Sequence, residues 1–255
     1  MPEPALTQEL LALSFAFMMV LCRCGAAVML LPGFGEEGPP VTVRAGIAIG
    51  LAVLLVPSIA PQLPPPPDNF VRLVALLVGE LLAGGFLGWL ARVVALALPA
   101  AGQIVSLATG LSSVLQPDAD FGASTSSLGK LFAMMMPVLI LASGLYALPL
   151  TALAGSYAAL PAGAPPPGAD LTEMAVRAVS AHFALALRLA APFLLIGTMW
   201  QVALGLISRL VPQIQIYFAA LPGQVLGGLL LLAVLSGGVA TVWLRAVGDA
   251  FQVLP

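Results

Sequence analysis

Five charged residues lie within or beside long apolar runs, and ionic pairing is the chemistry that such residues can perform. An arginine at the middle depth of a bilayer costs on the order of 2.5–3.5 kcal/mol on insertion scales, so each charge should face a partner, a wet lumen or an interface. Glu80 and Arg92 stand about 18 Å apart along one straight helix, so any pairing must be between helices. The five residues are Arg23, Glu80, Arg92, Arg188 and Arg209, and we interpret the first four as buried charges at interfaces.

Motifs for enzymatic chemistry are weak in this chain. The segment Gly33-Phe34-Gly35-Glu36-Glu37-Gly38 has the spacing of a dinucleotide loop, but two prolines follow it where a helix N-terminus must receive the pyrophosphate. His182 is the single histidine and has no evident cysteine or carboxylate set around it, which favours a packing or interface role. Cys22 and Cys24 would point to different sides of a helix, so we expect two buried thiols and no bridge. We therefore predict no enzyme, no catalytic residue, no metal site and no cofactor.

A further set of polar residues follows helical spacing. Glu173 stands four residues before Arg177, in the favourable orientation for a pair on one helix face. Ser180, Ala184 and Arg188 continue the same face. This face is either solvated at the level of lipid headgroups or meets a partner subunit or a wet channel, and the sequence leaves both interpretations open.

The composition indicates the class of protein in which these residues lie. The 255 residues are 60% hydrophobic and 8% charged, with a mean hydropathy of +1.08, whereas soluble domains have roughly 25% charged residues. This indicates an integral membrane protein. The net charge of -2 is far from the basic balance of nucleic-acid binders, so nucleic acid is excluded as a partner. Glu3 and Glu9 precede the first apolar run, unlike the basic start of a secretory signal, so we expect that run to remain in the mature protein.

Apolar runs cover most of the chain, and segments rich in proline, glycine and acids separate them. The clearest breaks are 32–40, 61–68 with four consecutive prolines, 116–127 and 161–170. We expect an all-α membrane protein of six to eight kinked hydrophobic helices packed as hairpins, with no sheet. The runs occupy residues 10–32, 43–60, 70–98, 100–115, 131–160, 175–207 and 214–244.

The last two runs form a predicted helical hairpin with a polar tip. Residues 189–207 and 218–244 are each about as long as the roughly 20 apolar residues that span a bilayer. A hairpin that served only as an anchor would not need a tip with spaced polar residues. The tip therefore indicates that the functional residues lie at helix ends and loops. The tip residues singled out are Arg209, Pro212, Gln213 and Gln215.

Prolines and glycines within the apolar runs indicate how the helices pack. Each interior proline frees backbone groups that neighbouring helices, side chains or water must satisfy, which favours helices packed in protein over helices bathed in lipid. Three glycine pairs with small-xxx-small spacing allow close backbone approach. The prolines are Pro99, Pro137, Pro149, Pro192 and Pro222, and the glycine pairs are Gly46/Gly50, Gly84/Gly88 and Gly223/Gly227.

Four blocks of residues, spread over essentially the whole chain, resemble the FliR family of flagellar and type III secretion export-gate proteins. Any one block is weak, but their order and spacing together are specific. The last block looks more like the flagellar branch than the injectisome branch. The blocks are Arg23 with Leu31-Pro32-Gly33-Phe34, Pro40 to Arg44 and Val56-Pro57; Gly79-Glu80 with Gly84, Gly88, Ala101-Gly102-Gln103 and Thr109 to Ser112; Gly155-Ser156-Tyr157 with Leu160-Pro161; and Ser208-Arg209, Pro212-Gln213, Ile216-Tyr217-Phe218 and Leu221-Pro222.

The resemblance implies a single-copy member of a hetero-oligomeric, helical, cone-shaped export gate in the bacterial inner membrane at the flagellar basal body. It implies FliP, FliQ and FlhB homologues as partners and unfolded export substrates as cargo. It also implies a FliP-like part over residues 1–165 and a FliQ-like helical hairpin over residues 166–255. The expected function is structural and gating, without catalysis.

The resemblance further implies a plug in the lumen and a hairpin tip that helps to close the cytoplasmic entrance. The plug corresponds to Gly110, Leu111, Ser112, Ser113, Val114, Leu115, Gln116 and Pro117, and the tip to Arg209, Pro212, Gln213 and Gln215. This chain has Gln116 before the proline, where many relatives would have an acid.

Two other classes of function compete with the export gate. A small-molecule secondary transporter would also have broken helices and buried charges at mid-depth, but no convincing inverted repeat is present. An intramembrane hydrolase needs a nucleophile and a base within reach, and no motif supplies them. Basic residues are spread almost evenly over the loops, so they do not determine the membrane orientation.

Overall fold

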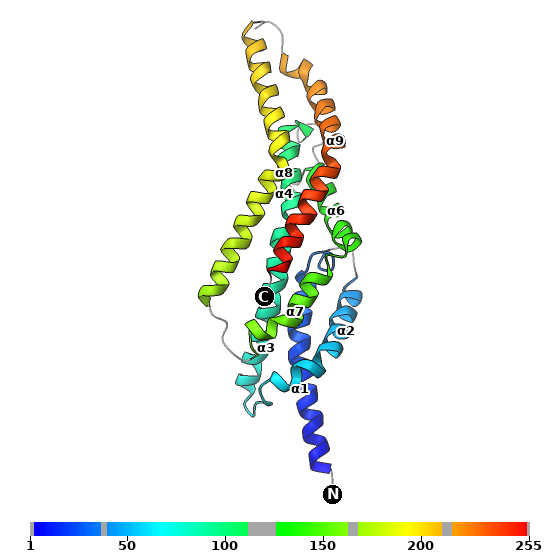
Figure 1. Cartoon of the computed structure of the whole chain (residues 1–255), viewed down its shortest axis with the longest axis vertical. Coiled ribbons are helices and arrows are strands. Elements are labelled where there is room, and N and C mark those ends of the chain that lie inside the picture. The colour runs from blue at the N-terminus through cyan, green and yellow to red at the C-terminus, as the bar shows by residue number, and fades with distance from the viewer. Residues whose placement is uncertain (1–2, 37–39, 112–125, 163–167, 211–215, 254–255) are drawn as a thin grey trace. The chain divides into compact units, whose positions relative to one another are not determined.

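The computed structural model describes residues 3–36, 40–111, 126–162, 168–210 and 216–253. Over these residues the secondary structure is helical and contains no strand, which confirms the predicted all-α class. The described α-helices, labelled as in Figure 1, are α1 (Glu3–Leu30), α2 (Val41–Ile59), α3 (Phe70–Ala95), α4 (Ala97–Ala108), α6 (Ser127–Ser143), α7 (Ala147–Ala159), α8 (Gly168–Leu210) and α9 (Ile216–Gln252), and a short 3-10 helix, η1 (Ala60–Gln62), follows α2.

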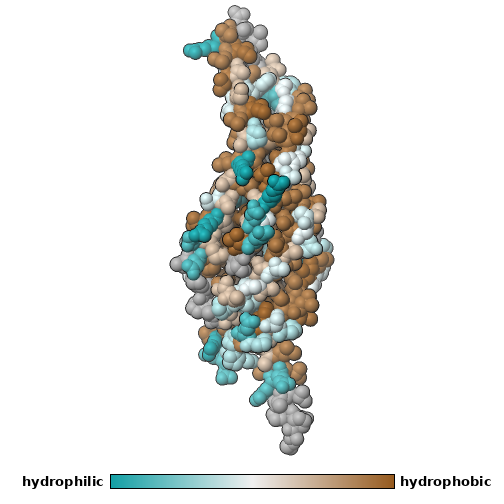
Figure 2. Space-filling view, viewed as in Figure 1, coloured by the Kyte–Doolittle hydropathy of each residue, from teal (hydrophilic) through white to brown (hydrophobic). Residues whose placement is uncertain are grey.

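The helices have the length and composition of membrane spans, as predicted. Five of the described helical segments are long and apolar enough to cross a bilayer, and a sixth span results if the bent pair α6 and α7 counts as one. Figure 2 shows hydrophobic side chains over much of the visible face. Large exposed apolar side chains include Leu54, Leu82, Val138, Met199 and Val234. The surface therefore needs lipid or protein to cover it.

The described residues form two compact units. The first unit takes its residues from 1–94, 140–178 and 248–255, and the second from 95–139 and 179–247. Because α6, α8 and α9 each contribute residues to both units, the units are parts of one continuous helical chain.

The core of the first unit joins α1 to α2, α3 and α7. Figure 1 shows α1 and α2 side by side. Ala16, Val20 and Cys24 of α1 pack in one buried cluster with residues of the other three helices, among them Val56 of α2 and Leu87 of α3. Small residues recur along these faces, so the helix backbones lie close together and distant parts of the sequence share one core.

The second unit packs α4 against α6, α8 and α9. Gly102 of α4 lies so close to α6 that an added Cβ atom would stand 3.0 Å from the Cα atom of Gly129. Gln103 of α4 accepts a hydrogen bond at Oε1 from the backbone N–H of Ser126, just before α6 begins. Trp243 of α9 is completely buried. These contacts set the position of α4, whose C-terminal end carries the first residues of the predicted plug.

One predicted apolar run is divided in the structure, and two of the predicted interior prolines lie at helix starts. Within the apolar run 131–160, Gly144, at a φ of 77°, separates α6 from α7, and the two helices bend by 75°. Pro99 and Pro149 lie in the first turns of α4 and α7, not in helix interiors. A first-turn residue has no intrahelical acceptor for its N–H, so proline costs little there. Pro137, Pro192 and Pro222 do lie inside their helices, as predicted.

Candidate functional site

The most buried charges of the chain form one cluster in the first unit. The guanidinium group of Arg23 on α1 donates to both carboxylate oxygens of Glu80 on α3, with Nε 2.7 Å from Oε2 and Nη2 3.0 Å from Oε1. It also donates to Oγ of Ser156 and to the carbonyl oxygen of Leu160. The ring of Tyr157 covers the guanidinium plane, with Cζ 3.7 Å from the ring centroid. Both charged residues are 1% exposed.

Close helix contact brings the two charges together. A Cβ atom added to Gly84 of α3 would collide with the carbonyl oxygen of Arg23, and one added to Gly88 would stand 2.7 Å from the carbonyl oxygen of Ala27. Only glycine lets the backbones of α1 and α3 approach in this way, as the predicted small-xxx-small spacing indicated. Glu80 lies one turn before Gly84, so the close approach presents its carboxylate to Arg23.

The cluster is electrically neutral and well hydrogen-bonded. A buried ion pair needs good geometry and further hydrogen bonds to offset desolvation, and a planar guanidinium supplies both when it meets a carboxylate in bidentate fashion. The hydroxyl group of Ser156 in turn donates a hydrogen bond to the carbonyl oxygen of Leu153. The arrangement ties α1, α3 and α7 together.

A second ion pair of the first unit is weaker and partly exposed. Arg92 donates through Nη1 to the carbonyl oxygen of Gly35 at 3.2 Å and through Nη2 to Oε2 of Glu36 at 3.4 Å. Gly35 and Glu36 belong to the segment that resembled a dinucleotide loop by its spacing. Part of that segment therefore forms a turn, and the carboxylate of Glu36 in this turn neutralises the charge of Arg92 in the last turn of α3. Glu80 pairs with α1, as the prediction of pairing between helices requires, whereas Arg92 pairs with Glu36 in a turn.

The predicted polar face of α8 is exposed. Glu173 and Arg177 form an ion pair on the surface, and Ser180, Ala184 and Arg188 are exposed along the same helix. Arg188 is therefore not buried within this chain, in contrast to Arg23 and Glu80. Its role at an interface with another subunit stays a prediction.

The C-terminal end of α4 leads into the predicted plug. Gly110 adopts a φ of 74°, the left-handed region that favours glycine. Thr109 is buried and donates through Oγ1 to the carbonyl oxygen of Val105, and Leu111 is 4% exposed. Residues 112–117, the rest of the predicted plug, lie outside the described residues.

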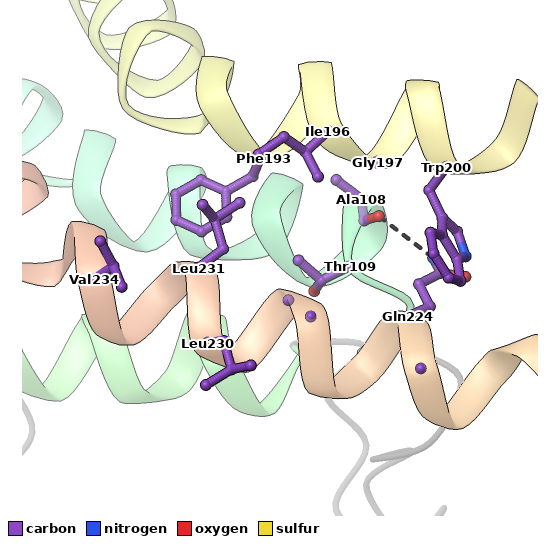
Figure 3. Close-up of a pocket in the computed structure, with 13 residues that line it drawn as sticks. Ala108, Thr109, Phe193, Ile196, Gly197, Trp200, Gln224, Leu230, Leu231 and Val234 are labelled. Atoms are coloured by element: carbon purple, nitrogen blue, oxygen red, sulfur yellow. Dashed lines mark hydrogen bonds between the residues drawn. The ribbon is translucent and has the colours of Figure 1, made fainter. Parts of the chain in front are cut away.

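Helices α8 and α9 hold this end of α4 from two sides. A Cβ atom added to Gly197 of α8 would stand 2.6 Å from the carbonyl oxygen of Ala108, and Gly228 of α9 lies against the side chain of Thr109. Gln224 of α9 donates through Nε2 to the carbonyl oxygen of Ala108 at 3.4 Å (Figure 3). Its amide group also lies beside Gly110. The backbone that leads into the predicted plug is thus packed against α8 and α9.

A cavity of about 410 Å³ opens beside this contact, within the second unit. Figure 3 shows α8 and α9 on opposite sides of it, with Phe193 and Trp200 projecting from α8 and Gln224 from α9. The lining is mostly apolar and carries no charged side chain. Its residues are Ala108, Thr109, Phe193, Ile196, Gly197, Trp200, Gly223, Gln224, Gly227, Gly228, Leu230, Leu231 and Val234.

The predicted hairpin is present as two long helices, α8 and α9, but most of its tip is not described. Arg209 lies in the last turn of α8 and is exposed. Pro212, Gln213 and Gln215 lie outside the described residues. The role of the tip is therefore untested.

Residues considered for metal or redox chemistry do not assemble into a site in the described ranges. Both cysteines are free thiols; Cys24 is buried as predicted, whereas Cys22 is only half-buried. His182 is half-buried and meets the ring of Phe183 edge to face. Within the described residues no three histidine, cysteine or acidic side chains come together in a way that could hold a metal ion.

Several residues of these sites were not singled out from the sequence. Ser156, Tyr157 and Leu160 appeared only as a block of the resemblance, yet they complete the surroundings of Arg23. Gln224 and Trp200 were missed. A glutamine inside an apolar helix is costly to leave unpaired, so Gln224 carried a usable signal.

Comparison with known proteins agrees with the predicted resemblance. The family model described as "Bacterial export proteins, family 1" matches residues 14–250. Flagellar biosynthetic protein FliR of Caulobacter vibrioides is 32% identical over 225 residues, which cover 88% of this chain and 90% of the relative. The protein of the same name from Escherichia coli K12 is 27% identical over 237 residues, covering 92% and 89%. Yop proteins translocation protein T of Yersinia pestis is 29% identical over 212 residues, covering 81% and 80%. With a match over nearly its whole length, the chain belongs to the bacterial export proteins, family 1.

Proposed function

We propose that this protein is a structural and gating subunit of the flagellar type III export channel in the bacterial inner membrane, at the basal body. It assembles in single copy with homologues of FliP, FliQ and FlhB and helps to admit unfolded flagellar substrates. The observation that carries this proposal is the family match over residues 14–250. The flagellar system is favoured by the block of residues around the tip of the α8–α9 hairpin, which resembles the flagellar branch. The identities of 32% and 27% to two flagellar relatives and 29% to a Yop translocation protein do not by themselves separate the two systems.

The exposed apolar surface supports a subunit that needs protein neighbours. The apolar segment Asp170–Leu210 has 41 residues and is about 62 Å long at 1.5 Å per residue. A hydrocarbon core of about 30 Å covers about 39 Å of a helix that is tilted by 40°. The rest of such a helix requires cover from other polypeptides or from elsewhere in the chain, yet Leu195, Met199 and Leu206 are exposed.

The competing proposal of a small-molecule secondary transporter has less support. Its main argument was buried charge at mid-depth. Arg23 and Glu80 neutralise each other in a closed hydrogen-bonded cluster, which leaves neither charge open to a solute. Membership in a family of export proteins favours the export subunit instead.

Within the proposed gate, residues 110–117 form the lumen seal and the tip with Arg209, Pro212, Gln213 and Gln215 closes the cytoplasmic entrance. Small apolar and hydroxyl side chains would seal the lumen yet yield to a passing chain. Residues 1–165 are the FliP-like part, and residues 166–255, which contain α8 and α9, are the FliQ-like hairpin. Deleting part of 112–117 should make cells leaky to ions, and unchanged permeability with normal export would count against this seal.

The subunit proposal is tested by purification of the tagged chain from cells that lack the native copy. We expect homologues of FliP, FliQ and FlhB to co-purify and the tagged chain to restore secretion of flagellar proteins. A cysteine at position 209 should crosslink to FliQ or FlhB in the intact assembly. The proposal is wrong if the isolated chain carries a solute in liposomes by itself and no such partners co-purify.

A further inference from the structure

The cavity beside Gln224 contains two buried polar atoms without partners. Nε1 of Trp200 is a hydrogen-bond donor, and Oε1 of Gln224 is an acceptor, and neither has a partner within the described residues. Gln224 is 8% exposed. Both residues line the cavity (Figure 3). A buried donor and a buried acceptor left unpaired are each costly, so their presence in one cavity points to a missing occupant that can pair with both.

The wall of the cavity on α9 is shaped for a helix. Gly223 and Gly227 stand four residues apart and are exposed, and a Cβ atom on Gly227 would meet no atom within 4 Å. Such a small-xxx-small stripe lets another helix approach the backbone closely. Leu230 and Val234 continue this side of α9 and are largely exposed. The stripe and these two side chains therefore form an open surface with the two unpaired polar atoms beside it.

The chemistry of the lining restricts the occupant. The described lining has no charged side chain, so the occupant is neutral where it enters. One donor and one acceptor together match a hydroxyl or a carboxamide group, each of which both donates and accepts. A lipid acyl chain does neither. Serine, threonine, asparagine and glutamine on an apolar helix supply the matching group.

The length of α9 favours a polypeptide over lipid as the cover. Its apolar segment Ala219–Gln252 has 34 residues, about 51 Å, and only 6% of an 18-residue apolar window within it is buried in the chain. Even a 40° tilt places only about 39 Å within the hydrocarbon core, so about 12 Å of this apolar segment lies beyond the acyl chains and favours a polypeptide as its cover.

We propose that the surface formed by Gly223, Gly227, Leu230 and Val234, with Trp200 and Gln224 beside it, binds an apolar helix of a different polypeptide. That helix places a serine, threonine, asparagine or glutamine side chain against Nε1 of Trp200 and Oε1 of Gln224. The inference rests on the proposed function only in treating the chain as a subunit of a membrane assembly. It adds which surface binds the neighbour and which chemistry recognises it.

The first test compares two glycines on the same helix. Gly227→Leu fills the cavity side of α9, whereas Gly237→Leu adds the same side chain at an exposed glycine outside the cavity, where an added Cβ atom also has nothing within 4 Å. Both variants gain the same helix propensity. A photo-crosslinking residue at position 230 of the full chain, expressed with its natural partners, reports the neighbour.

We expect position 230 to form an adduct with a second, distinct membrane polypeptide in the parent and the Gly237→Leu chains. Gly227→Leu should lower the adduct yield at least tenfold without reducing the amount of inserted chain. Mass spectrometry of the adduct should place the crosslink on an apolar helix that contains serine, threonine, asparagine or glutamine. An adduct with lipid only, an adduct between two copies of this chain, or equal yields in both glycine variants would overturn the inference.

The second test removes one polar atom. Trp200→Phe keeps most of the ring and deletes Nε1, so the adduct yield should fall about threefold, the effect of an average hydrogen bond between membrane helices. If the yield is unchanged, the polar recognition is wrong. The two proposals can fail separately. An adduct with a helix of a protein other than the FliP, FliQ and FlhB homologues would support the binding surface and contradict the proposed partners. Co-purification of those three homologues without any adduct at position 230 would support the proposed partners and contradict the binding surface.

Discussion

The indole Nε1 of Trp243 donates a hydrogen bond of 3.1 Å to the backbone carbonyl oxygen of Ala95. In a continuous helix that carbonyl would accept from the N–H of residue 99, but Pro99 has no N–H. Trp243 is completely buried, so its donor replaces the missing backbone bond where α3 ends and α4 begins. The Trp243 side chain of α9 thus pairs with the Ala95 carbonyl oxygen, which has no backbone donor because residue 99 is a proline.

Trp243→Phe should destabilise the protein, because it leaves the Ala95 carbonyl oxygen unpaired. The expected cost is about 1–3 kcal/mol of unfolding free energy, in addition to the loss of ring volume. Pro99→Ala restores an N–H that can reach the carbonyl, so the same tryptophan substitution should cost less in that background. The measurement is the unfolding midpoint of the purified assembly for all four members of the cycle. Equal losses in both backgrounds would show that the two residues are not coupled.

Glu80→Ala should be far more damaging than a comparable change at an exposed ion pair. Removing the carboxylate leaves the guanidinium of Arg23 buried and unpaired, which costs about 3–5 kcal/mol. Glu173→Ala, which breaks the exposed pair with Arg177, should have no measurable effect. The amount of chain that accumulates in the membrane and its resistance to protease are the measurements. Similar behaviour of the two variants would contradict the structural role of the buried cluster.

Charge reversal should fail to rescue the cluster. In Arg23→Glu with Glu80→Arg the two charges still oppose each other, but the new carboxylate faces the carbonyl oxygen of Leu160, which only accepts hydrogen bonds. We expect the double variant to remain within a factor of two of the worse single variant in accumulation. Full recovery would indicate that the net charge alone matters.

Gly84→Ala should separate α1 from α3, since the added methyl group collides with the carbonyl oxygen of Arg23. Gly79→Ala on the same helix meets nothing within 4 Å and gains roughly 1 kcal/mol of helix propensity. The first variant should therefore lower the unfolding midpoint and the second should leave it unchanged or raise it. Thermal unfolding of the two variants in parallel checks this, and equal midpoints would argue against close packing at Gly84.

Gly110→Ala tests the proposed seal. Both Gly110 and Gly144 adopt positive φ, so alanine at either position is strained by roughly 1–2 kcal/mol. Only Gly110 begins the predicted plug, and an added Cβ atom there would also stand 3.0 Å from Nε2 of Gln224. We expect ion leakage in cells that carry Gly110→Ala and none with Gly144→Ala. Leakage from both would indicate general loss of packing in place of a seal.

Most helices could be predicted because their signal is local. The runs 10–32, 43–60, 175–207 and 214–244 correspond to α1, α2, α8 and α9, with ends that differ by up to eight residues. Apolar length against bilayer thickness is a property of each segment by itself, so it can be read along the chain. The bend between α6 and α7 could not be predicted in this way, because Gly144 lies within an unbroken apolar run and only its backbone conformation marks the break.

The candidate sites could be predicted only in part. Hydropathy indicated that Arg23 and Glu80 need partners on other helices, but the pair is separated by 57 positions and depends on the contact at Gly84. Arg188 has the same local signal as Arg23 and is nevertheless exposed. Burial is decided by which face of a helix meets its neighbours, and local composition does not encode it.

The sequence by itself determined that this protein is an all-α membrane protein of the export family, because apolar length, scarce charge and the order of motifs are additive along the chain. Only the tertiary structure decided that Arg23 pairs with Glu80, that Trp243 serves the carbonyl opened by Pro99, and that Trp200 and Gln224 meet one cavity. These relationships depend on helix faces brought together over long separations. Close packing selects these contacts, and the local sequence of one segment does not show which other segment it will pack against.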